Sequence, residues 1–337
     1  MSSGRRRAAF LALVVGCLAV AAVAIAAGRD SQRPLRGEAG TAAAAFARIR
    51  ADGSPAVLFR SSARDDGQVA LAAAGAQAGA RTPVPLRCER VAFAGDHGLC
   101  LARSGGVAPG YRAEVFGPDF KVRHTLAVDG IPSRARVSPD GRYGAVTLFV
   151  TGHAYAAAGS FSTETTLIDL ASGRKIAELE DFTVTRDGRQ VTAVDVNYWG
   201  VTFARDSDRF YATLATGGRT YLIQGSVSGR SAHTLHENVE CPSLSPDGTR
   251  VAYKSRTGSR SRPWRLTVLD LRTMRETPLA ERRSIDDQAE WLDNGHVLYG
   301  VDGQIWSASA DGKGSPRRFA VQASSPAVIR RSDASAD

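Results

Sequence analysis

The Gly-x-Ser-x-Gly pentapeptide, which places the nucleophile of an α/β-hydrolase on a sharp strand-to-helix turn, does not occur in this chain of 337 residues. Calcium loops are lacking as well. Asp206-x-Asp208 and Asp65-Asp66-Gly67 do not continue into an EF-hand loop that ends in glutamate. The sequence therefore predicts no catalytic residue, no metal site and no cofactor, and we expect a non-enzymatic protein.

Lysine is also scarce, since only four of the 43 basic residues are lysines, while the formal net charge is +9. A GC-rich genome would favour arginine codons in this way. The excess of positive charge would also attract anionic wall polymers or lipid headgroups. Both interpretations stay open. Nucleic acid is not an expected partner, because the compartment inferred below excludes it.

Cysteine occurs four times. Cys17 lies in an apolar N-terminal segment. Cys88 and Cys100 lie on either side of the turn at Gly95-Asp96, on two neighbouring strands. An oxidising compartment permits a disulfide between them if their Cα atoms lie within about 7 Å. The pair is a candidate disulfide, and we expect Cys241 to be free and buried.

A cluster of potential metal ligands surrounds His233-Thr-Leu-His236, followed by Glu237, Glu240 and Cys241. Residues three apart on a strand face opposite sides of the sheet. The two histidines would therefore not converge on one metal ion. We interpret the cluster as ordinary surface and core residues.

The N-terminus contains Arg5-Arg-Arg7 followed by the uncharged apolar run Ala8–Ala27. Twenty apolar residues are enough to span a bilayer, with the arginines on the cytoplasmic side. Ala24-Ile-Ala26 also fits a signal-peptidase site, and Cys17 resembles a lipobox cysteine. An uncleaved signal anchor, a cleaved signal peptide and a lipoprotein all place the remaining chain outside the cytoplasm. We expect anchoring to the outer face of the cytoplasmic membrane, or secretion after cleavage.

Residues 28–54 are predicted to be a linker, in which the alanine-rich stretch Thr41–Arg50 favours a short helix. From Pro55 onward, short apolar runs alternate with glycine, proline and Asp-Gly, which is typical of an all-β chain. Residues 332–337 are expected to be a disordered tail.

A repeated unit organises the β region. Ser245-Pro-Asp-Gly248 is predicted to be a tight turn between two strands, because proline and glycine suit the second and fourth turn positions. The turn returns as Ser138-Pro-Asp-Gly141, and more degenerate copies elsewhere keep an aromatic residue followed by the aspartate. Aligned on their structural aspartates, the copies lie 44, 66, 41 and 46 residues apart: Asp96, Asp140, Asp206, Asp247 and Asp293. Such periods are typical of four-stranded propeller blades.

The best copy, Pro242-Ser-Leu-Ser-Pro-Asp-Gly248, resembles the WD40-like (PD40) repeat of the TolB-like β-propeller family. The resemblance covers roughly residues 55–331. It implies an all-β, six-bladed propeller with a non-catalytic interaction role outside the cytoplasm. The resemblance would also imply a small α/β domain before the propeller, but only residues 28–54 separate the apolar segment from the first strand, so we expect that this domain is missing.

The blades follow from this period. Blade one supplies only strands 56–61, 68–73 and 81–86, so we expect the C-terminal strand 324–329 to complete it and close the ring. Blade three is oversized, and we assign to it a loop over Thr151–Ser162 and an extra hairpin at Asp187-Gly188. The remaining blades are placed at 88–128, from 201 to 226, 239–280 and 286–321.

Connectivity predicts a binding face. The Ser-Pro-Asp-Gly turns share one face, so the long loops after each second strand emerge on the other. Arginine and aromatic side chains on such loops favour protein binding. The candidates are Arg103, Tyr111, His153, Tyr155, Phe161, Arg256, Arg260, Arg262 and Trp264. They could equally be solubilising insertions. A protein partner is expected. A lectin-like binder of wall polysaccharide and a hydrolase or lyase with a site in the central funnel are the alternatives.

Overall fold

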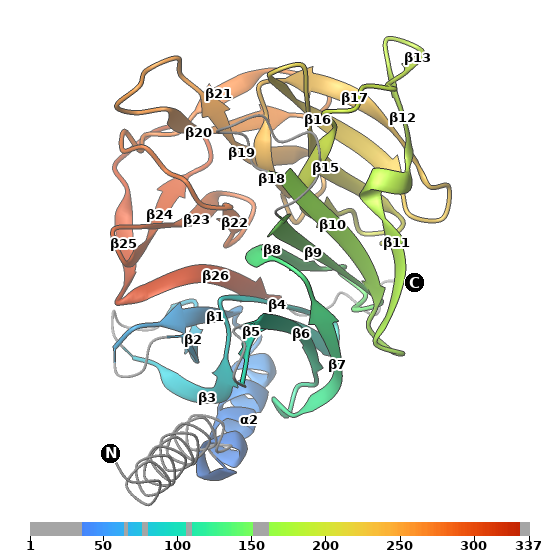
Figure 1. Ribbon diagram of the computed structural model, residues 1–337. Helices are drawn as coiled ribbons and strands as arrows, with labels where there is room; N and C mark the ends of the chain where they lie inside the picture. Colours follow the sequence, from blue (N-terminus) through green and yellow to red (C-terminus); the bar gives the residue numbers. More distant parts are fainter. Residues whose placement is uncertain (1–35, 64–66, 76–79, 106–109, 151–161, 331–337) are drawn as a thin grey trace, which may run out of the picture.

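The computed structural model describes residues 36–63, 67–75, 80–105, 110–150 and 162–330, and within them six sheets are arranged in a ring (Figure 1). The predicted all-β six-bladed propeller is confirmed. The N-terminal segment 1–27 and the tail 332–337 lie outside the described residues. Among the residues described, no helix is both long and apolar enough to cross a membrane.

Each sheet forms one blade, and its strands are given from the centre of the ring outward. Blade one contains β26 (Ala323–Ile329), β1 (Ala56–Ser61), β2 (Gln68–Ala73) and β3 (Thr82–Arg87). Blade two contains β4 (Arg90–Ala94), β5 (His97–Ser104), β6 (Gly110–Phe116) and β7 (Val122–Val128). Blade three contains β8 (Ile131–Val137), β9 (Tyr143–Val150), β10 (Ser162–Asp169) and β11 (Arg174–Glu178), after which a 3₁₀ turn, η1, covers Leu179–Asp181.

Blade four contains β14 (Asn197–Phe203), β15 (Arg209–Thr216), β16 (Arg219–Ser226) and β17 (Ser231–Glu237). Blade five contains β18 (Glu240–Leu244), β19 (Arg250–Arg256), β20 (Trp264–Asp270) and β21 (Glu276–Pro278). Blade six contains β22 (Glu290–Trp291), β23 (His296–Val301), β24 (Gln304–Ser309) and β25 (Arg317–Val321).

The repeated turn is held together by its own polar side chains. Ser245 Oγ donates a hydrogen bond to Asp247 at 2.5 Å, and the same carboxylate accepts the Thr249 N–H at 3.0 Å. Gly248 has a φ of +73°, which a residue without a Cβ adopts freely. Burial alone would raise the pKa of Asp247, but these hydrogen bonds and Arg250 lower that pKa to about 2. The turn therefore needs serine, aspartate and glycine for its structure.

The C-terminal strand pairs with the first strand of the β region. β26 lies antiparallel to β1, with Ala56 opposite Ile329 and Val57 opposite Val328. β26 also contacts strands of the neighbouring blades two and six. The first blade thus takes its innermost strand from the end of the chain.

The hairpin at Asp187-Gly188 belongs to blade four, so its assignment to blade three was wrong. It consists of β12 (Thr183–Arg186) and β13 (Arg189–Gln190), and β12 pairs in parallel with β17. Blade four therefore has six strands. The hairpin satisfies backbone groups that the outer edge of β17 would otherwise leave unpaired.

The helix α2 (Arg36–Ala51) begins before the predicted Thr41–Arg50 stretch and packs against blades one and two (Figure 1). Phe46 is 2% exposed, and its ring lies 5.4 Å from that of Phe93 and 5.7 Å from that of Phe120. This part of the predicted linker is therefore part of the folded unit.

Cys88 and Cys100 are joined by a disulfide, with their Cα atoms 5.4 Å apart. The bond links the residue before Glu89 to the second strand of blade two. Cys241 is free and buried.

Candidate functional site

The loop residues proposed from the sequence do not form one patch in the described part of the chain. Arg103 and Tyr111 belong to blade two, whereas Arg256 and Trp264 belong to blade five, across the ring (Figure 1). His153, Tyr155 and Phe161 lie outside the described residues. The prediction placed these loops on the same side of the ring but could not place them relative to one another.

Several of these side chains already have partners. Arg103 forms an ion pair with Glu89 at 2.7 Å. Arg256 donates to Glu240 at 2.9 Å, and its guanidinium lies 4.7 Å from the centre of the Trp264 ring. Arg260 and Arg262 are exposed. The loop side of blade five is therefore partly occupied by contacts within the blade.

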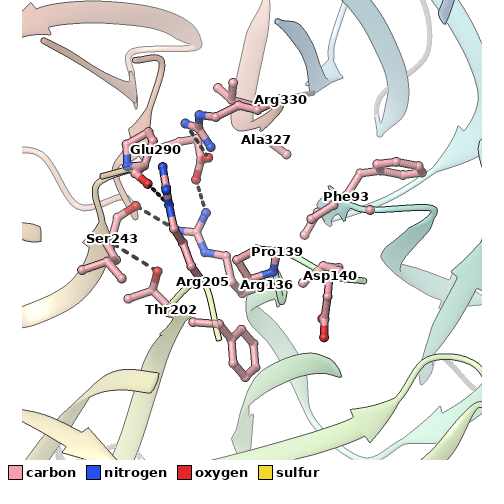
Figure 2. Close-up of a pocket in the computed structure, with 18 of the residues that line it drawn as sticks. Phe93, Arg136, Pro139, Asp140, Thr202, Arg205, Ser243, Glu290, Ala327 and Arg330 are labelled. Atoms are coloured by element: carbon pink, nitrogen blue, oxygen red, sulfur yellow. Dashed lines mark hydrogen bonds and ion pairs between the residues drawn. The ribbon is translucent and has the colours of Figure 1, made fainter. Parts of the chain in front are cut away.

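A cavity of about 450 Å³ lies at the centre of the ring, and Figure 2 shows the side chains that surround it. Its wall comes from the innermost strands of the blades and from the turns that follow them, including Pro139 and Pro246. We call the side that carries these turns the turn face, and the opposite side the loop face. The cavity therefore lies toward the turn face, opposite the face that the sequence predicted for binding.

The same position of the repeat supplies a cavity-lining residue in every blade. In each copy an apolar residue ends the innermost strand or stands just before the turn, and we call this position the apolar slot: Phe93, Val137, Phe203, Leu244 and Trp291, with Val328 as the counterpart on β26. The residue just before the apolar slot lines the cavity in every blade: Ala92, Arg136, Thr202, Ser243, Glu290 and Ala327. Alternate residues of a strand face the same side. When the apolar slot packs between blades, the preceding residue must therefore face the channel. This periodic position was the signal that could have located the site from the sequence.

The charged side chains of the wall are linked to one another. Arg136 Nη1 pairs with Glu290 Oε2, and Arg330 Nη2 lies 3.7 Å from the other oxygen of the same carboxylate (Figure 2). Arg136 Nη2 lies 3.4 Å from Ser243 Oγ. Arg330 also donates to the main-chain oxygen of Trp291. One carboxylate is thus shared between two arginines.

A second layer of charge lies below, toward the loop face. Arg90, Arg134 and Asp287 line a small space of about 30 Å³ that Arg136 also reaches. Arg90 Nε donates to Ser133 O at 2.6 Å, and Arg134 is 9% exposed. Burial lowers the pKa of Arg90, with Asp287 acting in the opposite direction. Arginine therefore predominates at both levels of the channel.

This arrangement is suited to binding. The cavity volume lies within the range of small-ligand pockets, about 300 to 1,000 Å³. Arginine remains charged in proteins and presents a rigid fork of donors to oxygen acceptors. Glu290 is engaged by two of these cations, Arg136 and Arg330.

Comparisons with known proteins support the fold. No family model matches the chain, and no curated protein is significantly similar to it. The crystal structure of TolB from Acinetobacter baumannii is similar with a TM-score of 0.52 and 16% identity, over 82% of this chain and 67% of that chain. The structure of a puromycin-hydrolyzing peptidase of Mycobacterium tuberculosis is similar with a TM-score of 0.50 and 18% identity, over 79% of this chain.

This chain spans only 43% of that peptidase chain. The crystal structure of a nidogen/laminin complex contains a chain similar at a TM-score of 0.50 and 10% identity, over 81% of this chain and 98% of that one. Likenesses at such low identity show the fold alone. The predicted TolB-like propeller fold is therefore confirmed.

Proposed function

We propose, from the TolB-like propeller fold of this chain, that it is a non-catalytic propeller that binds a protein partner at the central cavity of its turn face. The observation that carries the proposal is the cavity of about 450 Å³, which is lined by residues from all six innermost strands. Such a ring-shaped wall surrounds an inserted segment on all sides. The likeness to a chain from a complex of two proteins, nidogen and laminin, agrees with a binding role.

The turn face is favoured over the loop face by the distribution of contacts. Arg136, Thr202 and Glu290 come from three different blades and meet around one space. Arg103 and Arg256, by contrast, lie on opposite blades and pair with Glu89 and Glu240 of their own blades. Binding energy is concentrated where side chains converge in a pocket that excludes water.

A capture experiment separates the two faces. Pro139 is exposed at the rim of the cavity, so Pro139→Trp adds bulk there without changing the charge. With each protein used as bait in envelope extract, we expect this variant to capture at least about tenfold less of the partner recovered by the parent, equivalent to about 1.4 kcal/mol. Recovery is quantified by mass spectrometry, and each bait is checked for an unchanged melting temperature.

Two comparison baits make the result decisive. A triple change of Arg256, Arg260 and Arg262 to alanine is expected to keep most of the capture, and Arg189→Gln, at an exposed hairpin position, is expected to keep all of it. Loss in the triple variant with full capture by Pro139→Trp would move the binding surface to the loop face.

We further propose that the propeller lies outside the cytoplasm, held at the outer face of the cytoplasmic membrane by residues 8–27. The apolar run behind Arg5–Arg7 supports this orientation. A reporter that is active only outside the cytoplasm is expected to work when fused after Arg331. An inactive fusion, together with an active cytoplasmic reporter at the same position, would overturn the localisation.

A further inference from the structure

We propose that the central cavity binds an oxyanion, the carboxylate or phosphate group of its ligand, at Arg136 and Arg330. This inference deepens the proposed function, because it names the chemistry that the same cavity recognises. It rests on three features of the described residues: an excess of buried and half-buried cations, buried donor atoms without acceptors, and open space beside them.

The cations outnumber the anions in the channel. Arg90, Arg134, Arg136 and Arg330 face Glu290 and Asp287 across its two levels. Asp286 also acts on Arg90 and Arg134, but its carboxylate pairs with Lys254, so that pair adds no net charge. The side chains of Arg136 and Glu290 are only 16% and 8% exposed, so water screens these charges weakly. Two positive charges therefore lack a partner of opposite sign within this set.

The two remaining charged residues of the cavity wall do not supply the missing anions. Asp140 accepts hydrogen bonds within its own turn, from Ser138 Oγ at 2.6 Å and from the Arg142 N–H at 2.9 Å. Arg205 adds a further positive charge at the rim, where its Nε donates to Pro246 O at 2.9 Å. The balance at the turn-face end thus stays positive.

Three of the four arginines hold a donor with no acceptor. The Nε–H groups of Arg134, Arg136 and Arg330 are buried and have no hydrogen-bond partner among the described residues. A buried polar group without a partner is unfavourable, and it becomes favourable when an acceptor arrives. An oxyanion offers several acceptor lone pairs at once, whereas a neutral hydroxyl offers fewer and no charge.

The like charges also act on each other. Burial lowers the pKa of Arg330, Glu290 opposes this effect, and Arg136 lowers the pKa further. A second anion beside Glu290 would stabilise both guanidinium groups. The open cavity above this pair, visible in Figure 2 between Arg136, Arg330 and Phe93, provides the space for it.

The test is calorimetric titration of the folded chain with citrate and, separately, with inorganic phosphate. Binding of either probe supports the proposal, and the stronger of the two identifies the carboxylate or the phosphate as the preferred group. We expect Arg330→Gln to weaken the binding at least about tenfold, which corresponds to one lost charged contact. Binding of neither probe at millimolar concentration would overturn the proposal.

Two further variants protect the test from a folding artefact. Glu290→Gln removes the competing carboxylate while keeping its shape, so it is expected to tighten the binding of the same probe. Arg189→Gln removes one exposed positive charge on the outer hairpin of blade four and is expected to change nothing. Unchanged affinity in Glu290→Gln, or equal weakening by Arg189→Gln and Arg330→Gln, would show general attraction to a basic protein and reject the site.

The outcome is separable from that of the capture experiment. If Pro139→Trp loses the partner but neither anion binds, the turn face remains the binding surface and only the oxyanion inference fails. If an anion binds at Arg330 but Pro139→Trp captures normally, the oxyanion site stands and the proposed protein contact at this face fails.

Discussion

Deletion of Ser324–Asp337 is expected to abolish cooperative folding of the propeller. The deletion removes nearly all of β26, the innermost strand of blade one, including Ala327, Val328 and Ile329, each at most 5% exposed. It leaves the inner edge of β1 unpaired and opens the ring between blades one and six. We expect a loss of at least about 5 kcal/mol, comparable with the whole stability of an ordinary domain, about 5–15 kcal/mol.

Urea denaturation followed by circular dichroism measures this effect, and light scattering measures the aggregation expected from an exposed sheet edge. Removal of Ser332–Asp337 alone is the matched control, and its denaturation curve should superimpose on that of the parent. A protein lacking residues 324–337 that still melts cooperatively at the parent temperature would show that β26 is dispensable.

Phe46→Ala is expected to lower the free energy of unfolding by about 3–5 kcal/mol, the usual loss for a buried phenylalanine. The ring of Phe46 lies against Phe93 and Phe120 in the core shared by blades one and two. Its removal would leave a cavity beneath α2, which the disulfide-linked second blade cannot easily fill by collapse. Denaturant unfolding measures the loss.

Arg48→Ala is the control on the same helix, because Arg48 is exposed. A change at an exposed position away from special contacts is expected to stay within about 0.5 kcal/mol. If both variants unfolded at the parent denaturant concentration, α2 would be a linker, as the sequence alone suggested, with no role in the stability of the propeller.

The periodic turns made the fold predictable, because their chemistry is local. Ser245, Asp247 and Gly248 are joined by hydrogen bonds within five residues of chain, so the motif forms the same turn wherever it occurs. Strand number and blade spacing follow from its repetition. The pairing of Cys88 with Cys100 was also within reach, since both lie close to one short turn.

The hairpin and the helix were placed less well, because their partners are distant in sequence. β12 could have extended blade three, which precedes it, but it pairs with the edge of β17. The partners lie 48 residues further along the chain in each of the pairs Thr183–Ser231, Val184–Ala232 and Thr185–His233. Likewise, the alanine-rich composition of α2 indicated a helix. Only the packing of Phe46 showed that it is part of the core.

The sequence by itself predicted the class of fold and the position of the turns, since the turn contacts lie within about five residues of chain. The number of blades followed from the spacing of the turns together with the family resemblance. The tertiary structure alone decided where charge gathers. Arg136, Glu290 and Arg330 lie 154 and 40 residues apart in the chain. Arg136 and Glu290 share a repeat position, but the sequence does not show that their charges meet, and Arg330 lies outside that position. They meet because a closed ring turns the same strand position of every blade toward one axis. Arginines that are far apart in the sequence therefore line one cavity, and the cavity is positively charged.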